Sequence, residues 1–489
     1  MNLYYYWYWF ALPILALVNG LTFTRNAHIF QLNGYKPKVH TKWLTKHPFF
    51  LFIKPKEVKK PLVLTGRVKR LAIAYGLIVL LPVIAVILTR SVPVIITYMI
   101  YVAFFPLWPW ILMLANIICK PVEIAINNRY IADAKRIILD AKQSGLKVIG
   151  VTGSYGKTSV KFFAGKLLSA KFNVLITPES YNTTLGVVRT IREQLKASHE
   201  YFIVEMGARN PGDIKEICEI VQPDYGIITA IGEAHLESFG SVENITATKF
   251  ELIDALDEKD GIAFLNWDNE YIRNRKVILD NIVRFGISND DADYTARFVK
   301  VSERGSSFRI GDVYYATKLL GRHNILNLTS AIAVAVELGI SQEELILPMR
   351  RIEPVSHRLQ LFGGGDRYVI DDAYNSNPDG AAAALETLAG FRSYFKILIT
   401  PGMVELGERE FSANLNFGRR AALAADYIIL IGEEQTKPIR AGLRAEGAGD
   451  ERVSVFNSLT EGINLANSLD TGGKPRIILF ENDLPDNYS

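Results

Sequence analysis

One segment of the sequence carries the residue types that hold nucleotide phosphates. An apolar stretch at residues 148–151 is followed by a glycine-containing run, Thr152-Gly153-Ser154-Tyr155-Gly156-Lys157-Thr158-Ser159. Glycines let backbone N–H groups close around phosphate oxygens at a helix start, a lysine neutralises the β- and γ-phosphates, and a hydroxyl ligates magnesium. The run is shorter by one residue than the usual phosphate loop, because Gly150 does not stand at the required first position. We expect ATP to be bound by Gly153, Ser154, Gly156, Lys157, Thr158 and Ser159.

Polar motifs follow other apolar stretches further along the chain. Glu205 ends one of them, in Val204-Glu205-Met206-Gly207, and His235 lies in Ile231-Gly232-Glu233-Ala234-His235-Leu236-Glu237, fourteen residues before Lys249. Asp372 and Asn375 stand just past a predicted strand, at the end where open α/β sheets bind ligands. The remaining motifs are Gly321-Arg322-His323-Asn324-Ile325-Leu326-Asn327, His357-Arg358-Leu359-Gln360, the run 370–378 and the run 402–408.

In this order, the motifs resemble those of the Mur ligase family, and the resemblance covers about residues 147–489. It implies one magnesium ion on Thr158 and Glu205, and a second on His235 and a carbamylated Lys249. It implies catalytic roles for Lys157, His235, Lys249 and Arg358. Nucleotide contacts are implied for Asn324, Asn327, Asp372 and Asn375. Substrate contacts are implied for Ser180, Asn182, Thr183, Thr184, Tyr374 and Asn377.

Each of these residues also has a plain structural interpretation. Glu205 could cap a neighbouring helix, His235 could be a packed or surface histidine, and Lys249 could be a solvated helix lysine. Asn324 and Asn327 could be helix caps, and Asp372 and Asn375 could form Asx-turns.

The runs 370–378 and 402–408 resemble the branch of the family that adds D-alanyl-D-alanine. That resemblance implies an ATP-dependent, ADP-forming ligase of peptidoglycan synthesis. Such an enzyme activates the carboxylate of UDP-MurNAc-tripeptide as an acyl phosphate and joins it to D-Ala-D-Ala. Two alternatives remain open. One is a ligase for another carboxylate–amine pair, such as a poly-glutamate chain or an amidated lipid-linked precursor; the other is a nucleotide-binding membrane scaffold without turnover.

The motifs require a fold that brings strand ends together. Short Val/Ile-rich strands at 148–151, 202–205 and 225–229 alternate with helical segments, which predicts an α/β fold with a parallel sheet. Alternating strands between residues 284 and 318 predict a small antiparallel addition. A second, Rossmann-like α/β unit follows, with strands at 368–371, 396–400, 427–431 and 476–480. We expect a linker helix at 120–146, an ATP-binding central domain at 147–357 and a C-terminal domain at 358–489.

The first 119 residues differ in character from the rest. They contain one acid, Glu57, and apolar runs at about 4–23, 71–89 and 92–119, which predict three membrane spans around a basic loop at 24–70. This pattern predicts a multi-pass protein of the bacterial cytoplasmic membrane that contacts membrane lipid and has its catalytic domains in the cytoplasm. A signal peptide in place of the first span, or a hairpin of two short spans interrupted by Pro106 and Pro109, would change that topology. The three runs also stand where soluble family members carry the domain that holds the UDP-sugar, so a lipid-linked donor is a further alternative.

Charge and cysteine content argue against a nucleic-acid-binding protein, a disulfide-rich protein and a zinc-site protein. Residues 120–489 carry 42 bases against 50 acids, and this acidic balance argues against a nucleic-acid-binding surface. Two cysteines, Cys119 and Cys218, are too few for a disulfide framework or a zinc site.

Overall fold

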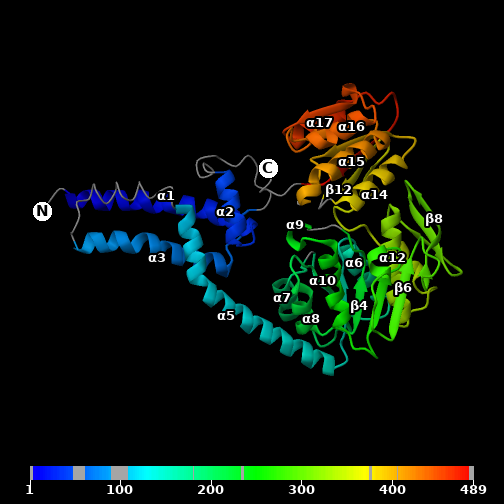
Figure 1. Ribbon diagram of the computed structural model, residues 1–489, viewed down its shortest axis with the longest axis horizontal. Helices are drawn as coiled ribbons and strands as arrows, with labels where there is room; N and C mark the ends of the chain where they lie inside the picture. The colour runs from blue at the N-terminus through cyan, green and yellow to red at the C-terminus, as the bar shows by residue number, and fades with distance from the viewer. Residues whose placement is uncertain are drawn as a thin grey trace. The chain divides into compact units, whose positions relative to one another are not determined.

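The protein is described here by a computed structural model covering residues 4–47, 61–89, 108–179, 181–232, 236–373, 377–404 and 406–483 (Figure 1). The chain divides into two compact units, Met1–Tyr130 and Ile131–Asp483. Helix α5 (Trp108–Gln143) has residues in both units.

The first half of the second unit is built on a parallel sheet in the order β2-β3-β1-β4-β5-β6-β7. Its strands are β1 (Lys147–Thr152), β2 (Val174–Ile176), β3 (Tyr201–Glu205), β4 (Tyr225–Ile228), β5 (Ile262–Asn266), β6 (Asn281–Gly286) and β7 (Tyr294–Thr295). The helices are α6 (Lys157–Leu168), α7 (Thr184–Gln194), α8 (Asp213–Val221), α9 (Leu236–Phe239), α10 (Val242–Asp254), α11 (Glu270–Arg273), α12 (Arg322–Glu337) and α13 (Ile346–Arg350).

This sheet is buried on both faces, because successive side chains of a strand point to opposite sides. Val148 packs into the core formed with α7, α8, α10 and the end of α5, whereas its neighbour Ile149 packs into the core formed with α6 and α12. Both strand positions are therefore apolar, as expected for a parallel sheet covered by helices. Figure 1 shows α6 and α12 on one side of the sheet and α7, α8 and α10 on the other.

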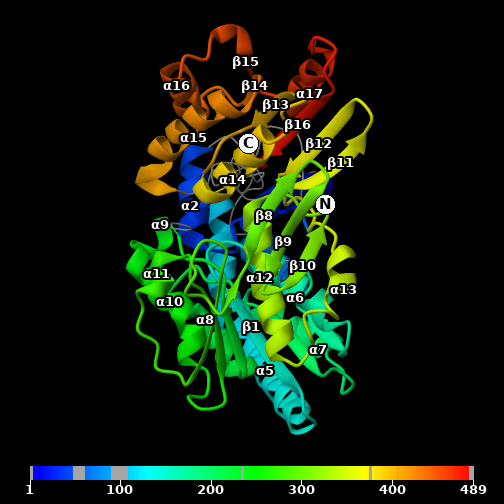
Figure 2. The ribbon, with the colours of Figure 1, turned by 90° about the vertical axis from the view of Figure 1, so that its right-hand side faces the viewer.

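A small antiparallel sheet lies between α11 and α12 in the sequence. Its order is β10-β9-β8, formed by β8 (Arg297–Ser302), β9 (Gly305–Ile310) and β10 (Val313–Thr317) (Figure 2). Phe308 and Tyr315 of this sheet are fully buried in the same core as α12.

The second half of this unit has a sheet in the order β11-β12-β16-β13-β14-β15, in which only β11 is antiparallel to its neighbour. The strands are β11 (Gln360–Gly364), β12 (Arg367–Asp372), β13 (Phe395–Thr400), β14 (Tyr427–Ile431), β15 (Val453–Phe456) and β16 (Arg476–Glu481). The helices are α14 (Pro378–Ala389), α15 (Glu410–Ala424), α16 (Lys437–Ala445) and α17 (Leu459–Ser468), with 3-10 turns η2 (Gly407–Arg409) and η3 (Asp450–Arg452). The predicted α/β class with parallel sheets is confirmed.

The first unit is helical in its described residues. It contains α1 (Tyr4–Leu32), α2 (Pro37–Lys46), α3 (Gly66–Thr89) and the first part of α5. Phe30, Leu71 and Leu112 are among its fully buried side chains. His40 is also fully buried, and its ring nitrogens meet Asn26 at 2.9 Å and Asn33 at 3.2 Å.

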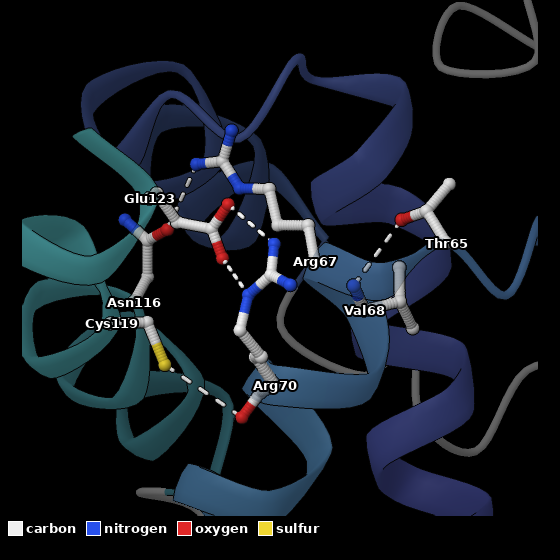
Figure 3. Close-up of polar contacts among 7 residues, drawn as sticks. All are labelled: Thr65, Arg67, Val68, Arg70, Asn116, Cys119 and Glu123. Atoms are coloured by element: carbon white, nitrogen blue, oxygen red, sulfur yellow. Dashed lines mark hydrogen bonds and ion pairs between the residues drawn. The ribbon is translucent and has the colours of Figure 1, made fainter. Parts of the chain in front are cut away.

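A polar cluster joins α3 to α5 (Figure 3). Arg70 makes a two-pronged ion pair with Glu123, with Nε at 2.5 Å and Nη2 at 2.8 Å from the two carboxylate oxygens. One turn away, Arg67 donates to Asn116 at 3.2 Å. The planar guanidinium donates two parallel bonds to the two carboxylate oxygens, so this pair fixes the position of α3 along α5.

The prediction of a multi-pass membrane protein is wrong. In the part of the chain that the structure describes, one helix stretch, Pro109–Gln143, is long and apolar enough to cross a membrane, and 39% of its most apolar window is buried inside the protein. A single stretch of this kind is weak evidence for a span, since core helices have the same length and composition. Residues 92–107, most of the expected third span, lie outside the described residues.

Candidate active site

The glycine-containing run forms the loop between β1 and α6. Gly153 has a φ of +149°, and a Cβ there would lie 2.1 Å from the Thr229 hydroxyl and 2.9 Å from the Ala230 carbonyl oxygen. Gly156 has a φ of +79°, and a Cβ there would lie 2.6 Å from Asn327 Oδ1. Glycine is therefore needed at both positions, for backbone conformation and for space.

The Lys157 side chain folds back over this loop. Its Nζ donates to the carbonyl oxygens of Gly153 at 2.6 Å and Ser154 at 3.1 Å. Burial lowers the Lys157 pKa to about 8, although the Glu205 carboxylate acts in the opposite direction. These two bonds hold the ammonium group over the glycine-containing loop.

Ser154 connects the loop to the segment after β4. Its backbone N–H donates to the Ala230 carbonyl at 2.7 Å, and its hydroxyl is 3.1 Å from both the N–H and the carbonyl oxygen of Gly232. Ser159 is buried on α6.

Glu205 ends β3 beside this loop and is 1% exposed. Its Oε1 accepts from the Thr158 hydroxyl at 3.0 Å and from Asn182 Nδ2 at 3.1 Å. Its Oε2 forms an ion pair with Lys161 at 3.0 Å. The neighbouring cations Lys161 and Lys157 hold the Glu205 pKa below its usual value against the effect of burial. Glu205 is therefore a charged carboxylate in contact with the hydroxyl predicted to bind magnesium.

Lys249 is buried on α10, with 3% of its surface exposed. Burial, followed by the charge of Lys157, lowers its pKa to about 7. The lowered pKa favours the neutral amine relative to an ordinary lysine. The alternative of a solvated surface lysine does not fit this burial.

Arg358 lies in the segment that joins the two halves of this unit. The flanking residues His357 and Leu359 both have left-handed backbone conformations, with φ of +60° and +47°. The charge of Arg358 lowers the pKa values of Lys157, Lys161 and His323, which places its guanidinium near the phosphate-binding loop.

Two aspartates at the end of β12 anchor this segment. Asp371 Oδ2 is 2.8 Å from His357 Nδ1, and Asp372 Oδ1 accepts from the Leu359 N–H at 3.1 Å. Burial raises the pKa of Asp372 to about 6. An Asx-turn is present at Asp371, whose Oδ1 accepts from the Ala373 N–H at 3.1 Å.

The two asparagines of α12 are buried but differ in surroundings. Asn324 Nδ2 donates to the Leu320 carbonyl at 2.8 Å, whereas Asn327 lies against Gly156 of the phosphate-binding loop. Neither side chain caps the helix, which begins after Gly321.

Some predicted substrate contacts have local structural partners. The Thr183 hydroxyl caps α7 by accepting from the Gly186 N–H at 3.3 Å, and Asn377 Oδ1 caps α14 by accepting from the Gly380 N–H at 2.8 Å. Thr184 donates to Glu216 at 2.5 Å. Four predicted site residues lie outside the described residues: Ser180, His235, Tyr374 and Asn375.

Five other predicted residues lie together at one end of the sheet: Lys157, Thr158, Asn182, Glu205 and Asn327.

Two further residues belong to this site, Lys161 and Thr229, although no motif in the sequence indicated them. Thr229 fills the space next to Gly153 and donates to the Tyr155 carbonyl and, at 3.2 Å, to the Thr152 carbonyl. Lys161 stands four residues after Lys157, which places both on one face of α6. This spacing was the available signal.

The residues present fit a magnesium ion in part. Among the described residues, no group of three or more His, Cys, Asp or Glu side chains could hold a metal. However, Glu205 Oε1 lies 3.0 Å from the Thr158 hydroxyl, and magnesium needs only one or two protein oxygens when phosphates supply others. Thr158 and Glu205 provide such a pair.

Fold and site together define a P-loop nucleotide-binding enzyme. Residues 151–335 match the Mur ligase middle domain, and residues 357–480 match the Mur ligase glutamate ligase domain. The UDP-N-acetylmuramoyl-tripeptide–D-alanyl-D-alanine ligase of Mycobacterium leprae is 31% identical over 356 residues, covering 66% of this chain and 68% of the relative. The chain belongs to the Mur ligase family, as the motifs predict, and is an ATP-dependent amide-forming ligase.

Other relatives agree. The ligase of the same name from Escherichia coli K12 is 28% identical over 333 residues, covering 65% of this chain and 73% of the relative. MurF from Acinetobacter baumannii has a TM-score of 0.64 at 26% identity, over 72% of this chain and 77% of that one. MurF from Thermotoga maritima in complex with ADP has a TM-score of 0.63 at 25% identity, over 73% and 80%. The chain spans 59% to 73% of the length of eight curated ligases with this name. None of these likenesses supports the expected membrane location.

Proposed function

We propose that the chain uses ATP to join the carboxylate of a UDP-MurNAc-tripeptide to D-Ala-D-Ala. The observation that carries this proposal is the match of both Mur ligase domains to relatives named for that reaction. Because the chain matches only part of these relatives, the identities of donor and amine are the parts that need a test.

Transfer of a phosphoryl group from ATP to a carboxylate requires positive charge where the two anions meet. A carboxylate is a poor electrophile, so the γ-phosphoryl group of ATP is transferred to it, and the resulting acyl phosphate is attacked by the amine. Two anions meet in the first step, and cations near the phosphates lower its barrier. Lys157 and Arg358 are the proposed cations, and the effect of the Arg358 charge on the Lys157 pKa supports this assignment.

Magnesium bound by Thr158 and Glu205 would neutralise charge between the β- and γ-phosphates. His235 and Lys249 are the proposed ligands of a second ion. Because a neutral amine is the form that reacts with carbon dioxide, the lowered pKa of Lys249 supports its carbamylation. In that reaction the lysine nitrogen bonds to carbon and releases a proton, leaving a carboxylate-like group.

The proposed nucleotide contacts are Asp372 at the end of β12, Asn375, which follows β12 in the sequence, and Asn324 and Asn327 on α12. Asn327 already lies against Gly156. Asn182 is the proposed link between bound donor and metal site, because it contacts Glu205 directly.

The test follows phosphate release by the full chain with ATP, magnesium, UDP-MurNAc-tripeptide and D-Ala-D-Ala. Turnover that needs both substrates and is lost in Lys157→Ala is expected. Replacing D-Ala-D-Ala by L-Glu or ammonia tests the amine. Turnover with L-Glu instead would point to a poly-glutamate product, and no turnover with any pair while ADP still binds would overturn the proposal.

A further inference from the structure

A fully buried lysine stands next to the proposed magnesium carboxylate. The Lys161 side chain is 0% exposed, and its ion-pair partner Glu205 is 1% exposed. Burial disfavours an ammonium group strongly, so such a lysine persists only where several partners compensate. Burial indeed lowers the Lys161 pKa, whereas Glu205 acts in the opposite direction.

Lys161 has two polar partners from different parts of the fold. Its Nζ lies 3.0 Å from Glu205 Oε2 at the end of β3, and it donates to the Glu179 carbonyl oxygen in the loop after β2. The Phe162 ring, 4.7 Å from Nζ, covers another side of the ammonium group. Lys161 therefore joins α6, β3 and the loop that leads to Asn182.

The bond to Glu205 determines how that carboxylate is presented. With Oε2 held by Lys161, Oε1 faces the Thr158 hydroxyl at 3.0 Å and Asn182 at 3.1 Å. One oxygen is thus occupied by the Lys161 ammonium group, and the other is directed toward the phosphate-binding loop.

The bond to Glu179 acts on the loop itself. Glu179 has a φ of +38°, a left-handed conformation that non-glycine residues rarely adopt without support. The same loop is fixed on its far side by the Gly207 N–H, which donates to the Asn182 carbonyl at 2.7 Å.

We infer that Lys161 is a positioning residue that fixes the proposed magnesium carboxylate, Glu205, relative to the loop carrying Asn182. In this way it sets the position of the donor carboxylate relative to the nucleotide. This inference rests on the proposed function. It assigns to Lys161 a role separate from that of Lys157, which donates its hydrogen bonds to the loop carbonyls, whereas Lys161 forms the ion pair with Glu205.

The test compares Lys161→Met with wild type in the full chain. Methionine keeps the length and apolar stem but removes both polar contacts. We expect kcat to fall at least 30-fold and the KM for the carboxylate donor to rise at least fivefold. Magnesium–ADP affinity by calorimetry should change less than threefold, because the glycine loop and Lys157 stay intact.

Two further variants separate positioning from folding. Lys161→Arg can keep a cation near both oxygens, and it should recover at least a tenth of wild-type kcat. Lys166→Met, on the exposed side of the same helix, should leave all constants within twofold. When Lys161 and Asn182 are both substituted, the loss of kcat should be smaller than the product of the two single losses, since both residues act on Glu205.

Unchanged kcat and donor KM in Lys161→Met would overturn the inference. Equal loss of ADP affinity and turnover would also overturn it, because that result indicates collapse of the phosphate-binding loop. If wild type itself fails with this donor and amine, the proposed function fails, whereas magnesium–ADP calorimetry still tests the inference separately: an affinity of Lys161→Met more than threefold below wild type would overturn it.

Discussion

At the scale of single residues, the site depends on cations that are kept out of water. Lys157, Lys161 and Lys249 all have lowered pKa values, with burial as the largest cause. The spacing of Lys157 and Thr158 after a strand is local, so the sequence could predict this pair. The surroundings of Lys161 and Lys249 could not be predicted, because their burial depends on β3 and on packing between elements distant in sequence.

Lys249 gives the first prediction, on pH. Its pKa is about 7 in the folded protein, below the usual 10.5, so the unfolded chain binds one more proton between these values and stability rises with pH through that window. Lys249→Met should abolish ligase activity but increase the free energy of unfolding at pH 7 by a few kcal/mol. The gain should shrink toward pH 10.

Denaturant unfolding of both proteins at pH 7 and pH 10, without bicarbonate, measures this difference. Exposed Lys166→Met is the control and should show no pH-dependent difference. A Lys249→Met protein less stable than wild type at pH 7 would contradict the prediction.

At the scale of elements, the β1–α6 connection depends on its glycines. Gly153→Ala would place a methyl group against the Thr229 hydroxyl and the Ala230 backbone. We expect at least tenfold weaker magnesium–ADP binding and a loss of about 1–3 kcal/mol in stability. Calorimetry and denaturant unfolding measure the two effects.

Gly145→Ala is the matched control for Gly153→Ala. Gly145 also has a left-handed φ, +99°, but a Cβ there meets nothing within 4 Å. It should lose about 1 kcal/mol of stability and keep ADP affinity. Equal ADP affinity in both variants would refute the steric explanation.

The α3–α5 pairing in the first unit depends on Glu123. Glu123→Gln removes the charge that Arg70 meets through two bonds (Figure 3). Because Arg70 is 35% exposed, solvent screens part of the effect, and we expect a loss of about 1–2 kcal/mol. Hydrogen exchange should accelerate in peptides of α3 and of the start of α5. The exposed pair Glu434–Lys437 offers a control, since Glu434→Gln should change stability by less than about 0.5 kcal/mol.

At the scale of the whole molecule, periodicity predicted the α/β class well. Strands β1, β3, β4, β13 and β14 fall where apolar runs bounded by turn residues placed them, because both faces of each strand are covered. In the N-terminal region, by contrast, the apolar runs predict a multi-pass membrane protein, and that prediction is wrong. An apolar run of this length also occurs in a helix that packs against other helices. In α5, for example, Leu112 and Ala115 are fully buried in the core of the first unit. The roles of the substrate-contact residues stay predictions, since Thr183 and Asn377 already cap helices.

The two cysteines give each compact unit its own chemical reporter of unfolding. Cys119 lies in the first unit and Cys218 in the second, and both are free and buried. Burial raises the pKa of both thiols, that of Cys218 to about 12, so neither reacts readily while its surroundings are folded. A short pulse of alkylating reagent across a denaturant series, read by mass spectrometry of the two peptides, should therefore yield a separate unfolding midpoint for each unit. Coincident midpoints in the wild type that stay coincident in Glu123→Gln would mean that the units unfold together, although each has its own core.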